Sequence, residues 1–193
     1  MSETIDLGPC SAELEVGERE QCVVLLPGAA YPTAAPLLWF ARELARQRGW
    51  STLAVLDRWR PDLDEPFAWA QDRARRALDA APGAVVVVGK SLASGATGIV
   101  AEAGLPAAWL TPLLDEAMVV DGLRAARAPT LLVGGSADPS WARDAIPRSP
   151  LVDVVELDGV DHALQWPGDV LASIAALDTV VRALDGFLDR ATT

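Results

Sequence analysis

Residues 84–96 have the sequence AVVVVGKSLASGA. The first five, Ala84–Val88, form a continuous apolar run, which is typical of a strand covered on both faces of a parallel sheet. Gly89 interrupts the run, and the small residues that follow Ser91 are compatible with a helix. This stretch therefore predicts a strand, a tight turn and a helix in direct succession, which is the repeating unit of an α/β fold.

The same alternation of apolar runs and helical stripes continues in both directions. Further strands are predicted at 12–16, 22–26, 51–56, 107–110, 130–133 and 152–157. Helices are predicted at 36–48, 67–78, 92–103, 115–126 and 170–188. The 12–16 segment alternates apolar and polar residues, which indicates a half-exposed edge strand.

The last predicted helix has a capping residue and one long apolar stripe. Asp169 can cap its N-terminus. The stripe consists of Val170, Ile174, Leu177, Val181, Leu184 and Leu188. The whole pattern predicts a three-layer α/β/α sandwich with a mostly parallel, twisted sheet, and the absence of a linker or repeat predicts a single domain over residues 1–193.

Composition narrows the classes of partner. A formal net charge of −11 opposes binding to nucleic acid and to anionic membrane surfaces, and no apolar run approaches the roughly 20 residues that span a bilayer. The first 20 residues lack the basic and apolar regions of a secretory signal, so a soluble, cytoplasmic protein is expected. Cys10 and Cys22 are then expected to be reduced thiols, and their spacing does not suggest a metal site.

Chemistry in a parallel sheet is expected where the strands end. Gly89-Lys90-Ser91-Leu92-Ala93 follows the Ala84–Val88 strand, and the small residues flanking Ser91 suit a sharp turn that lifts a hydroxyl above the sheet edge. Ala93 stands where such a turn usually has a second glycine. Alone, a Gly-x-Ser-x-Ala string also arises by chance.

Two further loops carry groups that could act with Ser91. Asp138 follows the 130–133 strand in the segment Gly134–Asp138, although Asp-Pro-Ser-Trp also resembles a helix start with Asp138 as its cap. His162 is the only histidine and follows the last predicted strand. A lone histidine is usually structural, but a base with a pKa near neutrality is what a serine nucleophile requires, and these residues occur in the order Ser, Asp, His.

The three loops resemble those of the α/β-hydrolase superfamily, in particular small members without a cap domain that are similar to dienelactone hydrolase. The resemblance covers nearly the whole chain and implies Ser91 as nucleophile, His162 as general base and Asp138 as the orienting acid. It also implies an oxyanion hole formed by the backbone N–H groups of Ala29 and Leu92. Dienelactone hydrolases have a cysteine where this chain has Ser91, which sets that particular substrate apart.

Several alternatives remain open from the sequence. Asp115 follows an earlier strand and is the second candidate for the acid, whereas Asp161 adjoins His162 too closely to orient its ring. Lys90 is expected to be a surface or structural residue. Candidate pocket residues, which could equally pack in the core, are Tyr31, Trp59, Trp141 and Trp166.

The function expected from these residues is hydrolysis of a small carboxylic ester or thioester through an acyl-enzyme on Ser91, without metal or organic cofactor. The partner is then a small acyl substrate, and the oligomeric state is not predicted. Acyl transfer or lactone hydrolysis on the same residues is an alternative. A binding protein that keeps the fold without catalysis is the alternative from another class.

Overall fold

The computed structural model describes residues 2–62 and 65–191. Within these residues, eight strands form one sheet in the order β1-β2-β4-β3-β5-β6-β7-β8. The strands are β1 (Ser2–Asp6), β2 (Ser11–Glu15), β3 (Gln21–Leu26), β4 (Ser51–Val55), β5 (Ala84–Lys90), β6 (Ala107–Leu110), β7 (Thr130–Gly135) and β8 (Val152–Leu157). The helices are α1 (Pro36–Gln47), α2 (Pro66–Ala80), α3 (Thr97–Glu102), α4 (Ala117–Arg124) and α5 (Val170–Arg190). Two 3₁₀ segments, Ser91–Ala96 and Arg143–Ala145, complete the elements.

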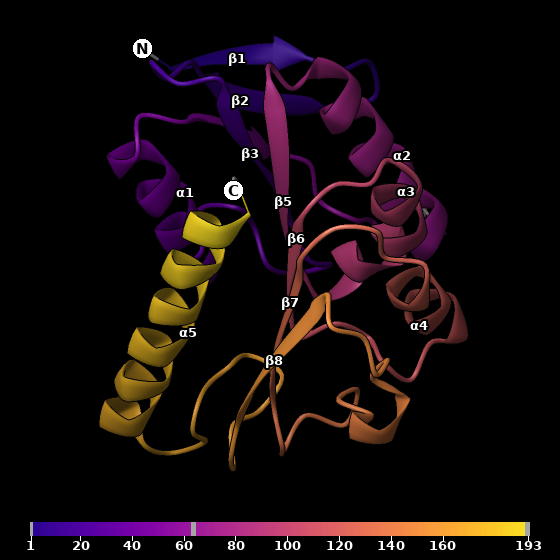
Figure 1. The fold of residues 1–193 in the computed structure, drawn as a ribbon, viewed down its shortest axis with the longest axis vertical. Coiled ribbons are helices and arrows are strands. Elements are labelled where there is room, and N and C mark those ends of the chain that lie inside the picture. Colours follow the sequence, from indigo (N-terminus) through magenta and orange to yellow (C-terminus); the bar gives the residue numbers. More distant parts are fainter. Residues whose placement is uncertain (1, 63–64, 192–193) are drawn as a thin grey trace.

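In the order of the sheet, the strands from β4 to β8 are parallel to one another, whereas β2 pairs antiparallel with both β1 and β4 at one side. Helices α1 and α5 cover one face, while α2, α3 and α4 cover the other (Figure 1). The structure thus confirms the predicted three-layer sandwich with a mostly parallel sheet. A connection with one short helix, α4, joins β6 to β7, and the described residues form no separate cap domain.

The two hydrophobic cores explain why the central strands are apolar throughout. In β3, Val23 and Leu25 pack towards α1 and α5, whereas Val24 and Leu26 pack towards the helices of the opposite face. Successive side chains of a strand point to opposite faces, so both sets must be apolar when both faces are covered. All four of these side chains are almost completely buried.

The strand predicted at 12–16 is present as β2, but its predicted place at the edge of the sheet is wrong. β2 lies between β1 and β4, and β1 forms the edge of the sheet. β1 was not predicted because its sequence, SETID, is polar and four of its five residues are exposed. An outermost strand is held by backbone hydrogen bonds to one neighbour, so it needs little apolar surface.

The segment predicted as a helix at 92–103 differs in detail from the structure, whereas the predicted cap of the last helix is confirmed. The first of these begins as the 3₁₀ segment Ser91–Ala96 and becomes α-helical only at Thr97. Such tighter turns are common at the beginning of helices. In α5, the Asp169 side chain accepts a hydrogen bond from the Ala172 N–H at 2.9 Å, as the capping prediction requires.

The apolar stripe of α5 is buried only in its C-terminal part. Leu184 and Leu188 are completely buried, whereas Val170 and Ile174 are 75% and 57% exposed. The apolar period predicted for this helix is therefore present, but its first two turns border a surface groove instead of the sheet. In the part of the chain that the structure describes, no helix has the length and apolarity needed to cross a membrane.

Lys90, the chain's only lysine, lies at the end of β5 and is buried. Its ammonium group donates hydrogen bonds to the Thr111 hydroxyl at 2.5 Å and to the carbonyl oxygen of His162 at 2.9 Å. Lys90 therefore connects β5 to the residue after β6 and to the loop after β8. Burial lowers the pKa of Lys90 to about 8, although the negative charges of Asp138 and Asp161 act in the opposite direction.

The single lysine makes its protonation directly measurable. With lysine labelled by ¹³C at Cε, the Lys90 resonance is expected to titrate with a midpoint near pH 8, well below the ordinary value of 10.5, because burial disfavours the charged amine. Between these two values the unfolded chain binds a proton that the folded chain does not, so the contribution of Lys90 to the unfolding free energy rises with pH. The same resonance in urea is the control, and a folded-state midpoint above 10 would contradict the prediction.

Candidate active site

The parallel pairing of β3, β5, β6 and β7 brings the loops at their carboxyl ends to one edge of the sheet. Ser91 follows β5 directly and has a φ of 53°, in the left-handed region that non-glycine residues rarely adopt. Glycine is needed at Gly89 for the packing beneath this turn, because a Cβ there would lie 2.6 Å from the Trp109 ring and 3.1 Å from the Ala93 side chain. The buried Ala93 is accommodated within the core cluster that contains Trp109.

The His162 ring lies between Ser91 and Asp138. Its Nε2 is 2.8 Å from the Ser91 hydroxyl, and its Nδ1 is 2.8 Å from a carboxylate oxygen of Asp138. Because a carboxylate can only accept, the proton of a neutral ring is on Nδ1 in this arrangement. Nε2 is then free to accept the hydroxyl hydrogen of Ser91. The three residues from separate loops thus form one continuous hydrogen-bonded chain.

The Asp138 carboxylate has two partners and is buried. One oxygen accepts from His162, and the other accepts from the Ser140 N–H at 2.9 Å. The bond from Ser140 belongs to a turn, and no helix begins directly after Asp138, so the helix-cap interpretation is wrong. The other oxygen makes the contact with the histidine. Its side chain is fully buried while that of His162 is 38% exposed, so the ring separates the carboxylate from solvent.

The loops that carry Asp138 and His162 are held close by glycine at the end of β7. A Cβ at Gly135 would lie 2.0 Å from the carbonyl oxygen of Val160, so only glycine allows this approach. Asp161 stabilises the histidine loop internally, because its carboxylate accepts from the N–H groups of Ala163 and Gln165 at 2.8 and 3.0 Å. These contacts fix the backbone on either side of His162.

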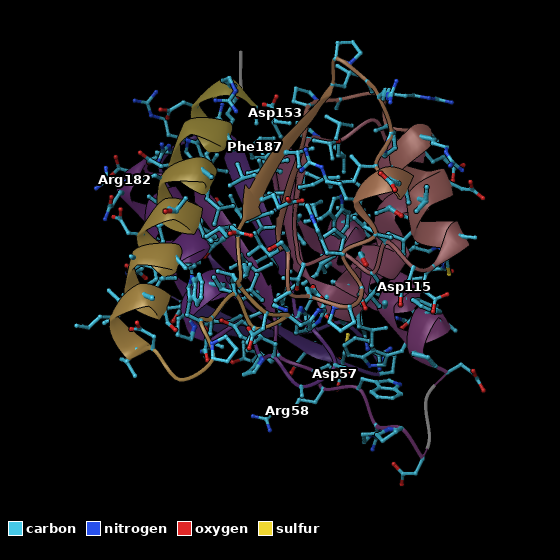
Figure 2. All side chains as sticks on the ribbon, turned by 90° about the horizontal axis from the view of Figure 1, so that it is seen from below. Asp57, Arg58, Asp115, Asp153, Arg182 and Phe187 are labelled. Carbon is cyan, nitrogen blue, oxygen red and sulfur yellow. The ribbon has the colours of Figure 1, made fainter. Side chains whose placement is uncertain are left out.

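Asp115 lies apart from this chain of hydrogen bonds. Its carboxylate is exposed and accepts a long hydrogen bond, 3.4 Å, from the Ser140 hydroxyl. Figure 2 shows it on the side of the sheet that carries α4, opposite Arg182 on α5. The structure therefore brings Asp138, and not Asp115, to His162.

The loop after β3 lies against the Ser91 turn. A Cβ at Gly28 would be 3.1 Å from the Lys90 carbonyl oxygen, and Ala29 packs against the cluster that includes Leu92. The two residues expected to donate backbone N–H groups are thus neighbours in space. A cavity of about 570 Å³ opens here. It is lined by Ala29, Ala30, Tyr31, Lys90, Ser91, Pro139, Asp161, His162 and Ala163.

Tyr31 is the aromatic candidate that lines this cavity. Trp141 is instead buried against Gly134 and donates to Glu156, while Trp166 packs over Gly159. Trp59 packs against the Leu92 cluster. Sequence reasoning did not assign Lys90 and Pro139 to the cavity, because nothing in the sequence shows that either residue faces the histidine loop.

Across residues 2–62 and 65–191, no group of three or more histidine, cysteine, aspartate or glutamate side chains is arranged to hold a metal ion. Cys10 and Cys22 are both buried and unpaired with each other. Burial raises the pKa of the Cys22 thiol to about 12, so this thiol stays protonated at neutral pH.

Comparison with family models and with curated protein sequences gave no match. Solved structures are similar over nearly the full chain. Dienelactone hydrolase from Anabaena variabilis has a TM-score of 0.77 at 18% identity, with 99% of this chain and 97% of that chain aligned. Mouse alpha/beta hydrolase domain-containing protein 10 has a TM-score of 0.70 at 12% identity, with 98% and 99% aligned.

A third similar structure is Est1E from Butyrivibrio proteoclasticus with bound ferulic acid. Its TM-score is 0.70 at 14% identity, with 98% of this chain and 99% of that chain aligned. At such low sequence identities, the similarity concerns the fold alone. In each comparison it extends over nearly the whole length of both chains. Together with the mostly parallel eight-stranded sheet of the described residues, these likenesses show that the chain has the α/β-hydrolase fold.

Proposed function

We propose that the protein is a serine hydrolase that cleaves a small carboxylic ester or thioester through an acyl-enzyme on Ser91. The observation that carries this proposal is the hydrogen-bonded chain from the Ser91 hydroxyl through His162 to Asp138, with both distances at 2.8 Å. A nucleophile, a base within hydrogen-bond reach and a group that orients the base are the three components that covalent acyl transfer requires.

In the first half of the proposed reaction, Nε2 of His162 takes the proton of the Ser91 hydroxyl as its oxygen attacks the acyl carbon. The resulting imidazolium is stabilised by the buried Asp138 carboxylate, which keeps its own negative charge. His162 then gives the proton to the leaving alcohol or thiol as the tetrahedral intermediate collapses. The acyl group remains on the Ser91 oxygen.

In the second half, a water molecule replaces the leaving group. His162 takes a proton from this water as its oxygen attacks the acyl carbon, and returns the proton to the Ser91 oxygen when the free acid leaves. Each proton removed is thus given back, and the enzyme returns to its initial state. The partial exposure of His162 is consistent with access for this water.

The N–H groups of Ala29 and Leu92 are proposed to stabilise the negative oxygen of both tetrahedral intermediates. The close approach of Gly28 to the Ser91 turn supports this assignment, because it places the two loops side by side. One such donor typically contributes about 3 to 4 kcal/mol to lowering the barrier. The positive φ of Ser91 also supports the proposal, since this turn lifts the hydroxyl away from the strand.

The similar structures support the same class of chemistry. One is a dienelactone hydrolase, and another, Est1E, has ferulic acid bound. Apolar residues, including Ala29, Ala30, Pro139 and Ala163, make up much of the cavity next to Ser91, which favours an acyl substrate over a highly charged one.

Replacing the proposed nucleophile tests the mechanism directly. Ser91→Ala is expected to lower kcat for p-nitrophenyl acetate by on the order of 10⁴-fold or more, because no acyl-enzyme can form. Wild-type protein is expected to react with a fluorophosphonate probe, and mass spectrometry of its peptides should locate the adduct on Ser91. Unchanged hydrolysis in the folded variant, or an adduct on another residue, would contradict the proposal.

Two aspartates provide a matched pair for the orienting acid. Asp138→Asn is expected to lower kcat by on the order of 10⁴-fold, because an amide favours the wrong tautomer of His162. Asp115→Asn, at an exposed site without contact to the histidine, should change kcat by less than about twofold. Both variants are to be compared at the same pH after their folding is checked by circular dichroism. The opposite order of effects would assign the role to Asp115.

A further inference from the structure

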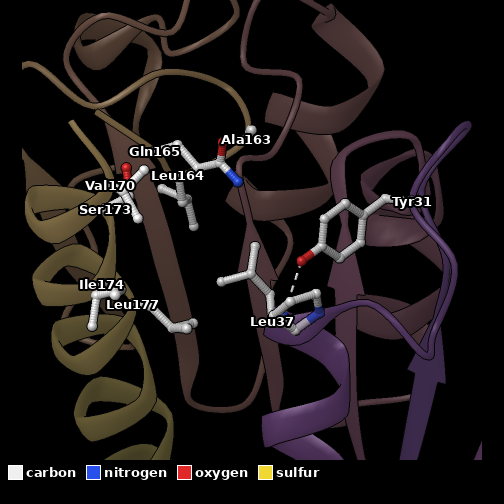
Figure 3. Close-up of a pocket in the computed structure, with 10 residues that line it drawn as sticks. Tyr31, Leu37, Ala163, Leu164, Gln165, Val170, Ser173, Ile174 and Leu177 are labelled. Carbon is white, nitrogen blue, oxygen red and sulfur yellow. Dashed lines mark hydrogen bonds between the residues drawn. The ribbon is translucent and has the colours of Figure 1, made fainter. Parts of the chain in front are cut away.

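A second cavity lies beside the one that contains Ser91. It has a volume of about 300 Å³ and opens between the start of α1 and the first turns of α5 (Figure 3). Tyr31 and Ala163 line both cavities, so the two spaces adjoin at these residues. We call the second cavity the α1–α5 groove. It is lined by Tyr31, Pro36, Leu37, Ala163, Leu164, Gln165, Val170, Ser173, Ile174 and Leu177.

The chemistry of the α1–α5 groove is apolar and uncharged. Most of its lining residues are aliphatic, and no charged residue is among the lining residues in the described part of the chain. This is unusual for a protein with a net charge of −11 and with 22% charged residues. Val170 and Ile174 remain 75% and 57% exposed on this wall. Exposed aliphatic side chains that gather around a concavity are typical of a binding site for an apolar group.

Tyr31 forms a fixed wall at the junction of the two cavities. Its hydroxyl oxygen accepts a hydrogen bond from the Leu37 N–H at 2.9 Å, which ties the ring to the first turn of α1. Figure 3 shows this bond and places the ring across the groove from Ile174 and Leu177. The polar tip of Tyr31 is thus engaged with the backbone, and its ring offers an apolar surface to both cavities.

We infer that the α1–α5 groove binds the uncharged aliphatic arm of an ester substrate whose carbonyl group lies at Ser91. This inference rests on the proposed function and specifies its substrate class as esters with a chain of medium length. An acetyl group fits within the cavity at Ser91, whereas a longer chain passes Tyr31 and Ala163 and enters the groove. Each methylene that leaves water there adds binding energy.

The position of the groove directly beside the Ser91 cavity favours a substrate arm over a second protein molecule as the occupant. The groove adjoins the Ser91 cavity, and its wall continues directly from His162 through Ala163 and Leu164. Leu171 is the most exposed large apolar residue of α5 at 79%, yet it does not line the groove. Leu171 therefore provides a matched control on the same helix.

The test is a series of p-nitrophenyl esters from acetate through butyrate and hexanoate to octanoate. For wild type, kcat/KM is expected to rise by roughly two- to fourfold for each methylene that enters the groove. Ile174→Gln should lower the ratio of octanoate to acetate by at least about threefold, because an amide replaces an apolar wall. Leu171→Gln should preserve both this ratio and the acetate activity. Ile174 is largely exposed, so both variants are expected to fold.

A second series identifies which arm of the ester occupies the groove. Acetate esters of linear alcohols from ethanol to octanol lengthen the leaving group while the acyl group stays constant. If kcat/KM rises with chain length in the first series and this rise depends on Ile174, the groove binds the acyl arm. If the same is found in the second series, the groove binds the alcohol arm. Either result supports the inference, and flat dependence in both series overturns it.

Binding to Ser91→Ala protein separates failure of this inference from failure of the proposed function. Calorimetric titration is done with hexyl acetate, which has a long alcohol arm, and with ethyl hexanoate, which has a long acyl arm. At least one of them should bind saturably, and Ile174→Gln should weaken this binding while Leu171→Gln does not. Ethyl acetate should not bind measurably. The proposed function fails if the protein does not hydrolyse acetate esters, or if it hydrolyses them equally well without Ser91. In either case, this titration alone tests whether the groove binds an aliphatic chain. Absence of binding by both hexyl acetate and ethyl hexanoate overturns the inference.

The oligomeric state gives an additional check on the occupant. Sedimentation velocity is expected to show the same species for wild type, Ile174→Gln and Leu171→Gln. A stable dimer that both substitutions dissociate would overturn the inference, because a second copy of the chain would then cover the groove.

Discussion

The parallel pairing of the buried strands β3, β5, β6 and β7 is the constraint on which the rest of the structure depends. It aligns their carboxyl ends, and with them the loops that carry Ala29, Ser91 and Asp138, along one edge of the sheet. β8 adds the His162 loop by pairing with β7. A shift of register between two of these strands would turn core side chains towards the wrong face, so packing on both faces keeps the four loops together.

Parallel alignment of the strands places these loops at the same edge of the sheet but does not by itself bring them into contact. Three local features do so. Gly135 allows an approach to the Val160 backbone that any side chain would prevent, and Gly28 keeps the loop after β3 close to the Lys90 carbonyl oxygen. Ser91 adopts a strained positive φ that the surrounding core maintains. The buried ammonium group of Lys90 donates to the carbonyl oxygen of His162, so β5, which leads to Ser91, also holds the backbone of His162. The hydrogen-bonded chain is thus held from its backbone as well as from its side chains.

The apolar surface of α5 is divided between folding and the proposed substrate. Leu184 and Leu188 stabilise the core on the α1 side of the sheet, whereas Val170 and Ile174 remain exposed at the α1–α5 groove. Exposed aliphatic residues give no stability from burial in the free protein, so their position beside the Ser91 cavity is better explained by a ligand than by folding. The C-terminal part of the apolar face of α5 thus packs in the core, and its N-terminal part is available to the proposed substrate.

The sequence by itself determined the α/β architecture, because buried parallel strands must be apolar throughout and the connecting helices must bear one apolar face, as in Ala84–Val88 and in α1. It also indicated Ser91, Asp138 and His162 through their positions after strands. Only the tertiary structure decided that Asp138 rather than Asp115 meets His162, that Lys90 is buried, that β1 forms the edge and that α5 begins beside a groove. Sequence periodicity is a local property of each element, whereas these contacts depend on which elements become neighbours and on how closely their backbones approach.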